Sequence, residues 1–141
     1  MVKLDISPLE KAIVQLDDSL TFCSSNDAKT NERLAVQFRS AAIQAFEFTY
    51  ELCWKMIKRY LELTVATPSE VDEYSFNTLI RTANEQGLLL TDLEKWGQYR
   101  KMRSTTSHTY DGGKAQEVFE IIPAFLKDAQ YLAEKLRQKI R

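Results

Sequence analysis

The spacing of apolar residues predicts helices along almost the whole chain. Between about residues 7 and 22, apolar side chains recur at steps of three and four, which is the period of one helix face. The same period predicts helices over about residues 30–63, 75–86, 91–105 and 114–139. We therefore expect one domain, residues 1–141, with an all-α fold. Its architecture would be an antiparallel up-and-down four-helix bundle with an additional short helix.

Boundary signals divide these helices. Ser7, Thr67 and Thr91 each stand three residues before a glutamate, the capping-box pattern in which a hydroxyl and a carboxylate satisfy free backbone N–H groups. Gly87 predicts a helix stop, and we expect residues 24–27 to be a plain connection. Residues 110–113 read as a turn, and Pro123 should kink or loosen the last helix.

The helix predicted over residues 30–63 is apolar around most of its circumference, with one polar stripe. Such a helix is central to a bundle or also packs against another chain, and we expect both. Glu47, Glu51, Trp54 and Lys55 are therefore candidates for a partner interface. For the charges of this group we favour an ordinary ion pair between Glu51 and Lys55, which are one helical turn apart.

Composition supports the helical prediction and narrows the chemistry. Four glycines and three prolines are about 5% of the chain, against roughly 12% in average globular proteins, and all-β folds need more turns than that. Two cysteines, Cys23 and Cys53, and a single histidine offer no zinc-type ligand set, and no Gly-rich phosphate loop occurs. We expect no metal and no cofactor. Without a signal-like or membrane-length apolar run, we expect a cytoplasmic protein.

The net charge of −1 hides an uneven distribution. Residues 95–110 contain four basic residues and no acidic one, which leaves 15 basic and 20 acidic residues elsewhere. A basic segment with aromatic residues interspersed can attract a phosphate backbone and stack a base. A solvated basic face over core aromatics is the alternative. The candidates for contact with RNA or a nucleotide are Lys95, Trp96, Tyr99, Arg100 and Lys101.

The end of this segment carries the candidate catalytic pair. Arg103 and His108 are five residues apart, with four hydroxyl residues between them and Tyr110 two residues further on. Histidine can exchange a proton near neutral pH, and a permanently charged arginine can hold a phosphoryl oxygen. Together they are the minimum for cleaving RNA without a metal, by attack of the ribose 2′-hydroxyl on the adjacent phosphate. A histidine that only caps a helix end is the alternative.

Arg103-Ser-Thr-Thr-Ser-His108-Thr-Tyr110 resembles the Arg-x4–6-His motif of HEPN domains. The wider chain, from about Leu9 to Leu136, resembles the nucleotidyltransferase substrate-binding protein family, the HEPN partners of minimal nucleotidyltransferases. The resemblance also rests on residues 43–55, on the Gly87-Leu88 helix stop and on residues 107–111. Family members commonly carry Asn after the motif arginine. Here Ser104 keeps a hydrogen-bond donor but lacks the reach of the amide.

The resemblance implies a bundle that dimerises and brings two Arg/His motifs together. It also implies a complex with a nearby-encoded minimal nucleotidyltransferase, as a toxin–antitoxin pair. The HEPN protein would be a metal-independent endoribonuclease with Arg103 and His108 as catalytic residues, and Ser104 and Ser107 would support the site. The partner would neutralise it, in some members by attaching AMP to the motif tyrosine, here Tyr110. The alternative is a non-catalytic substrate-binding subunit of a two-component nucleotidyltransferase.

Overall fold

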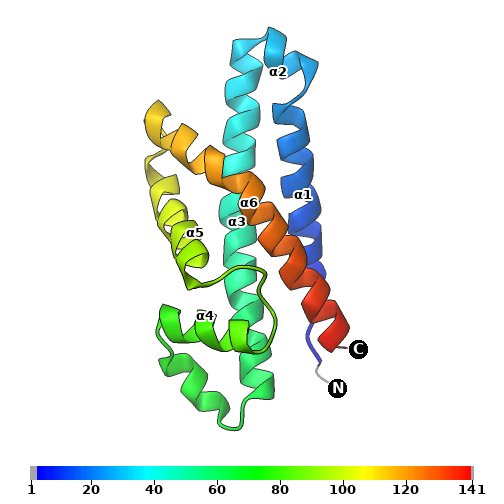
Figure 1. The fold of residues 1–141 in the computed structure, drawn as a ribbon. Helices are drawn as coiled ribbons and strands as arrows, with labels where there is room; N and C mark the ends of the chain where they lie inside the picture. The colour runs from blue at the N-terminus through cyan, green and yellow to red at the C-terminus, as the bar shows by residue number, and fades with distance from the viewer. Residues whose placement is uncertain (1–2, 141) are drawn as a thin grey trace.

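A computed structural model describes residues 3–140, and within that range every regular element is helical (Figure 1). The chain folds into the predicted all-α bundle. The α-helices are α1 (Ser7–Cys23), α2 (Asn26–Thr30), α3 (Glu32–Thr64), α4 (Phe76–Glu85), α5 (Leu93–Thr105) and α6 (Gly112–Lys139). Two 3₁₀ helices, η1 (Pro68–Glu73) and η2 (Thr106–His108), follow α3 and α5.

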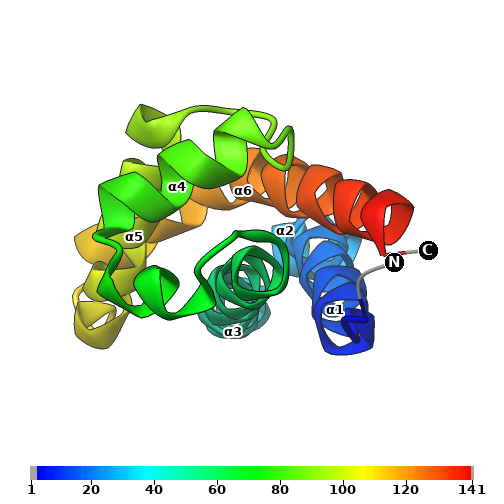
Figure 2. The same ribbon diagram turned by 90° about the horizontal axis from the view of Figure 1, so that it is seen from below.

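Four long helices form the bundle around α3. In Figure 1, α1 runs antiparallel to α3 on one side, α5 lies on the other side, and α6 crosses α3 diagonally. The short helix α4 contacts both α3 and α5, and Figure 2 shows it running from the side of α5 toward α6 when the bundle is seen from below. The α5–α6 junction forms a corner at the edge of the molecule.

An aromatic cluster centred on Phe125 of α6 joins three of these helices. The Phe125 ring meets Phe46 edge-on at 4.9 Å between centroids, Tyr99 at 5.2 Å and Trp96 at 6.2 Å. All four side chains are at most 1% exposed. Edge-to-face packing of this kind adds to the hydrophobic gain of burial. The cluster therefore fixes α5 against α3 and α6, and so positions the end of α5.

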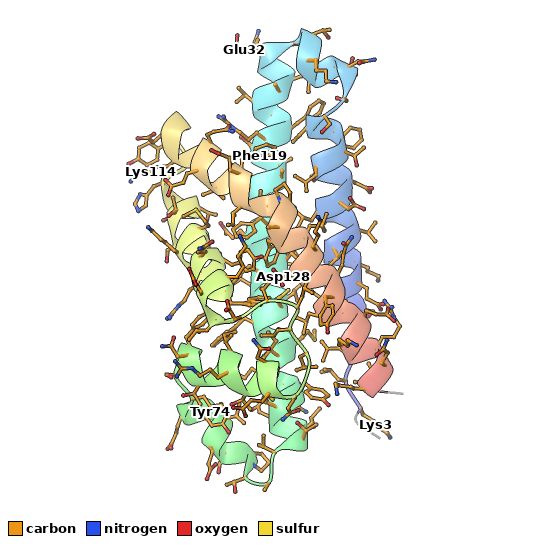
Figure 3. All side chains as sticks on the ribbon, in the orientation of Figure 1. Lys3, Glu32, Tyr74, Lys114, Phe119 and Asp128 are labelled. Atoms are coloured by element: carbon orange, nitrogen blue, oxygen red, sulfur yellow. The ribbon has the colours of Figure 1, made fainter. Side chains whose placement is uncertain are left out.

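A buried polar cluster ties the start of α5 to the middle of α6, at the residue labelled Asp128 in Figure 3. Asp128 is 1% exposed and accepts hydrogen bonds from the hydroxyls of Tyr99 and Thr91, the latter at 2.8 Å. Burial, followed by the bond to Asp128, raises the pKa of Tyr99, so this hydroxyl stays protonated as a donor. The two donors satisfy a carboxylate that would otherwise be costly to bury.

The predicted helix starts are close to the observed ones, but the three capping boxes are wrong. The Ser7 hydroxyl donates to Asp5, and Glu10 pairs with Arg137 of α6 instead of closing a box. Thr67 makes no side-chain cap bond and precedes a 3₁₀ helix. At α5 the cap is Asp92, because the Thr91 hydroxyl is engaged with Asp128.

Of three further predicted boundaries, the structure confirms one and differs at two. The predicted stop at Gly87 is confirmed: its φ of +76° suits glycine, and Leu88 N–H donates to the Ala83 carbonyl at 3.1 Å, as in a Schellman motif. Residues 24–27 are not a plain connection, because Ser25 caps the short helix α2. The predicted turn at 110–113 is likewise shorter: Asp111 caps α6, whose first turn contains Gly112 and Gly113.

The last helix runs unbroken through Pro123, so the residue marks no helix end.

No helix within residues 3–140 combines the length and the apolar character needed to cross a membrane.

Candidate functional site

The end of α5 is shaped by its run of hydroxyl residues. Thr105, Thr106, Ser107 and Thr109 each donate a side-chain hydrogen bond to a carbonyl three or four residues earlier. These bonds satisfy the carbonyls that lose their partners at a helix end, and they compete with continuation of the α-helix. The chain therefore tightens into η2, which carries His108 at a defined place just beyond Arg103.

Arg103 is held between α5 and α3. Its Nε donates to Glu51 Oε1 at 2.9 Å, and its Nη2 lies 3.9 Å from Glu47 Oε1. Its Nη1 donates to the Thr106 hydroxyl at 3.3 Å, and the same hydroxyl donates to the Arg103 carbonyl at 2.6 Å. Glu47, Glu51 and Thr106 thus fix the guanidinium, while the side chain remains 30% exposed.

The favoured ion pair between Glu51 and Lys55 is wrong. Glu51 instead pairs with Arg103, whose guanidinium also lies near Glu47. Lys55, on the same helix as Glu51, is exposed. Arg103 lies on another helix, 52 residues along the chain, so the sequence spacing gave no sign of this pair. Two carboxylates beside one guanidinium keep the site close to neutral in charge and hold the arginine in one orientation.

The side chains of His108 and Tyr110 are exposed to solvent and lie near each other. Both are exposed, Tyr110 to 88%, and their ring centroids are 6.3 Å apart. The His108 imidazole makes no hydrogen bond to any residue in 3–140, so it does not serve as a helix cap there. An exposed imidazole is free to approach a ligand.

Trp96 and Tyr99 do not belong to a ligand-contacting surface, which corrects the prediction for both. Trp96 is 1% exposed and Tyr99 is fully buried, because both pack on Phe125 in the bundle core. Their three-residue spacing places them on the inner face of α5. The structure thus favours the alternative given for these two residues, core aromatics beneath a basic helix face.

The basic residues of α5 do not form one patch. Arg100 and Arg103 line the same cavity, between α3, α4 and α5. Lys95 lies near the start of the helix, over the Tyr99 ring, and Lys101 faces a different hollow beside Glu117 and Glu120 of α6. Arg100 and Arg103 are therefore the pair placed to act together on an anion.

The motif lies between two hollows. On one side, Arg103 and Ser104 line the cavity of about 360 Å³ shared with Arg100. On the other side, Thr106, Thr109 and Tyr110 line a larger hollow of about 580 Å³ against the first half of α3, which Glu47 also borders. Ser107 is exposed, and its hydroxyl donates a hydrogen bond to the Ser104 carbonyl, so these two serines shape the turn. The motif is therefore accessible from solvent on both sides.

Nothing within residues 3–140 groups three or more His, Cys, Asp or Glu side chains in a way that could hold a metal ion. Both cysteines are free thiols, and burial raises the pKa of each. They lie in helices α1 and α3 and contribute to the apolar packing.

Sequence reasoning missed three residues around Arg103. Thr106 holds the guanidinium, and Tyr50 and Phe76 line the cavity beside it. Tyr50 lies next to Glu51 within the stretch that carries the family resemblance, which was the available signal. Phe76 gave none, since it reaches the cavity only through the packing of α4 on α3.

Comparisons with known proteins place the chain in a family. The family model for "Nucleotidyltransferase substrate binding protein like" matches residues 4–138. The chain belongs to this family. It is also similar to a protein of Haemophilus influenzae named "Probable ribonuclease HepT", with 37% identity over 139 residues that cover 97% of this chain and 94% of the relative.

A solved structure supports the same assignment. It too is from Haemophilus influenzae and was described as the fold of a substrate-binding domain of a nucleotidyltransferase. It superposes with a TM-score of 0.88 at 35% identity, over 94% of this chain and 99% of that one. The match extends over nearly the full length of both chains, so membership of the family includes the α5–α6 junction and the helices that hold it.

Proposed function

We propose that the chain is the HEPN toxin of a HEPN/minimal-nucleotidyltransferase pair, a metal-independent endoribonuclease that acts through Arg103 and His108. The observation that carries this proposal is the arrangement at the end of α5. Arg103 is fixed by Glu51 and Thr106 yet partly open to solvent, and His108 stands exposed on the next turn. The similarity to a relative named a probable ribonuclease supports the same activity.

The proposed chemistry needs one group that takes a proton, one that supplies a proton and a positive charge beside the phosphate, which two copies of the Arg/His motif would provide. The ribose 2′-oxygen attacks the adjacent phosphorus, the bond from phosphorus to the 5′-oxygen breaks, and a 2′,3′-cyclic phosphate and a 5′-hydroxyl result. His108 takes the 2′-hydroxyl proton or supplies the proton that the leaving 5′-oxygen needs. Arg103 binds the non-bridging oxygens, on which negative charge grows in the transition state. A homodimer would place two such motifs together and supply both proton-transfer roles.

The partner's action is proposed at Tyr110. Its 88% exposure leaves the hydroxyl accessible to a second enzyme, beside His108. A nucleotidyltransferase would join the tyrosine oxygen to the α-phosphorus of ATP and release pyrophosphate. An AMP group at this position would add negative charge next to the motif and repel the phosphate of an RNA strand.

The second candidate function is a non-catalytic subunit that presents a substrate to the nucleotidyltransferase. The similarity to a structure described as such a substrate-binding domain favours it. So does the exposed side chain of Phe48 on α3, which is 58% exposed and borders a groove of about 530 Å³ between α1 and α3. A partner surface and a ribonuclease site are compatible on one chain, and RNA cleavage decides between the two roles.

Replacement of Arg103 tests the activity. In buffer with excess EDTA, we expect the wild-type protein to cleave single-stranded RNA and Arg103→Ala to cleave it about 10²–10³-fold more slowly, because transition-state charge is left unbalanced. Arg103→Lys keeps the charge but loses the two-pronged geometry, so its rate should lie between them. No cleavage by the wild-type protein, or equal cleavage by Arg103→Ala, would reject the ribonuclease and leave the substrate-binding role.

Modification of Tyr110 has its own test. After co-expression with the neighbouring nucleotidyltransferase, we expect the intact mass to rise by one AMP group, peptide mapping to place it on Tyr110, and RNA cleavage to fall. Tyr110→Phe, which cannot accept AMP, should keep its cleavage activity in the presence of the partner. An unmodified Tyr110 in an inactive complex would instead mean that the partner neutralises the protein by binding alone.

A further inference from the structure

A cavity next to Arg103 remains outside the proposed chemistry. It measures about 360 Å³, within the range of about 300–1,000 Å³ that small-molecule sites occupy. Helix α3, the start of α4 and the second half of α5 line it, and each of these three helices contacts the other two. It is lined by Tyr50, Glu51, Trp54, Phe76, Arg100, Arg103 and Ser104.

One wall of the cavity is a stack of flat groups. The rings of Trp54 and Phe76 are nearly parallel, at 15°, with centroids 5.9 Å apart. The Arg100 guanidinium carbon lies 4.6 Å from the centre of the Phe76 ring. Aromatic rings and arginine planes are the groups on which proteins stack the bases of single-stranded RNA. Trp54 is half-buried and Arg100 exposed, so the stack is accessible from solvent.

Tyr50 adds a polar group without a partner. The side chain is only 6% exposed, and its hydroxyl makes no hydrogen bond to any residue in 3–140 although it lines this cavity. Burial raises the pKa of Tyr50, which keeps the hydroxyl neutral and able to donate or accept. The hydroxyl itself is accessible from the cavity, so it can exchange a water molecule for a polar group of a ligand.

The charges around the cavity suit a nucleotide. Arg100 and Arg103 are positive, and Glu51 is the one carboxylate among the lining residues. Glu51 uses Oε1 for Arg103, which leaves Oε2 to accept an N–H from the edge of a base. Glu47 and Glu51 both lie beside Arg103, whereas Arg100 pairs with no carboxylate within residues 3–140 and so adds a positive charge that can meet a phosphate. The two stretches that carry the family resemblance, around Tyr50 and around Arg103, thus meet in one cavity.

We infer that this cavity is a nucleobase-binding site, which holds the base of a nucleotide whose phosphate lies on Arg103. The base packs against the wall formed by Trp54, Phe76 and Arg100, and its edge meets Tyr50 and Glu51. The inference rests on the proposed function for the choice of RNA as the source of that nucleotide. A free mononucleotide has the same chemistry, and the experiment separates the two.

Binding is measured by calorimetry in a His108→Ala background, so that no RNA is cleaved. The ligands are a short single-stranded RNA, the four ribonucleoside 5′-monophosphates and ribose 5-phosphate. We expect the RNA to bind, and at least one monophosphate to bind about 5- to 150-fold more tightly than ribose 5-phosphate, the range expected for stacking of one base. Trp54→Ala should remove this advantage.

Tyr50→Phe is the second variant, because it removes one oxygen and leaves the packing intact. It should weaken the binding of the RNA and of the preferred monophosphate about 5-fold or more, and leave ribose 5-phosphate unchanged. Tyr131→Phe makes the same change on α6, away from the cavity, and should alter nothing.

One result would overturn the inference, and another would exclude RNA as the source of the nucleotide; they differ in what they say of the proposed function. If the monophosphates bind no better than ribose 5-phosphate, and both variants bind RNA like the parent, the cavity holds no base. Cleavage by the wild-type protein would then stand unaffected. If a monophosphate binds with the expected dependence on Tyr50 but RNA does not bind, RNA is not the source, and the ribonuclease proposal fails with it.

Discussion

His108→Ala is expected to slow RNA cleavage by about 10²–10⁴-fold, the usual contribution of a positioned general acid or base. The free energy of unfolding should stay within about 0.5 kcal/mol of the wild-type value, because the imidazole is exposed and makes no hydrogen bond within residues 3–140. Initial cleavage rates in excess EDTA, together with urea unfolding of the same preparations, measure both quantities.

The control for this variant is Gln98→Ala, another exposed polar side chain, on α5 but outside the motif. Its cleavage rate and stability should both match the wild-type protein. An active His108→Ala protein would show that the imidazole is not part of the chemistry. A variant that lost activity only because it unfolded would reveal itself in the urea curve.

Phe125→Ala is expected to lower the free energy of unfolding by about 3–5 kcal/mol, the cost of a large cavity in a packed core. Phe125 is fully buried and meets Phe46, Trp96 and Tyr99 edge-on, so no neighbour can move in to fill the space without losing its own contacts. Against a typical total of 5–15 kcal/mol, such a loss unfolds much of the protein at 37 °C. Urea or thermal unfolding followed by circular dichroism measures it.

Phe48→Ala makes the same substitution at a phenylalanine that is 58% exposed on α3. Its effect on the monomer should be about 1 kcal/mol or less, since little area leaves water there on folding. Equal losses from the two variants would mean that the aromatic cluster does not hold α5 against α3 and α6. The position of the motif would then need another explanation.

The helices were predictable because each long one must bury an apolar face, and that need repeats at the helical period. The helix caps were harder to predict, because a hydroxyl or carboxylate at a helix start can bond to distant side chains as well as to the nearby backbone. Thr91 bonds to Asp128, 37 residues away, and Glu10 pairs with Arg137 at the far end of α6. Gly87 was predictable because a positive φ is a local requirement.

The candidate site shows the same division. The order of Arg103, His108 and Tyr110 along the chain located the end of α5, and the hydroxyl residues between them do shape that turn. Which residues meet Arg103 depended on how α3 packs on α5, so Glu51 appeared in sequence to pair with Lys55. Periodicity alone could not settle the role of Trp96, because its three-residue spacing from Tyr99 fits a core face as well as a stacking surface.

The pairing of Glu51 with Arg103 gives the family resemblance a physical meaning. One stretch, residues 43–55, supplies the carboxylates and the tyrosine that face the other stretch, residues 103–110. These two segments therefore lie together in the fold, although more than 50 residues separate Glu51 from Arg103 in sequence.

The most direct test of the central claim uses an RNA with one 2′-deoxyribose at the cleaved position. In excess EDTA, the wild-type protein should cut the all-ribose RNA to products ending in a 2′,3′-cyclic phosphate and a 5′-hydroxyl. It should leave the singly deoxy RNA intact at that position, because the attacking oxygen is gone. Equal cleavage of both RNAs, or products that carry a 5′-phosphate, would contradict a metal-independent attack by the 2′-hydroxyl with Arg103 and His108 as its catalysts.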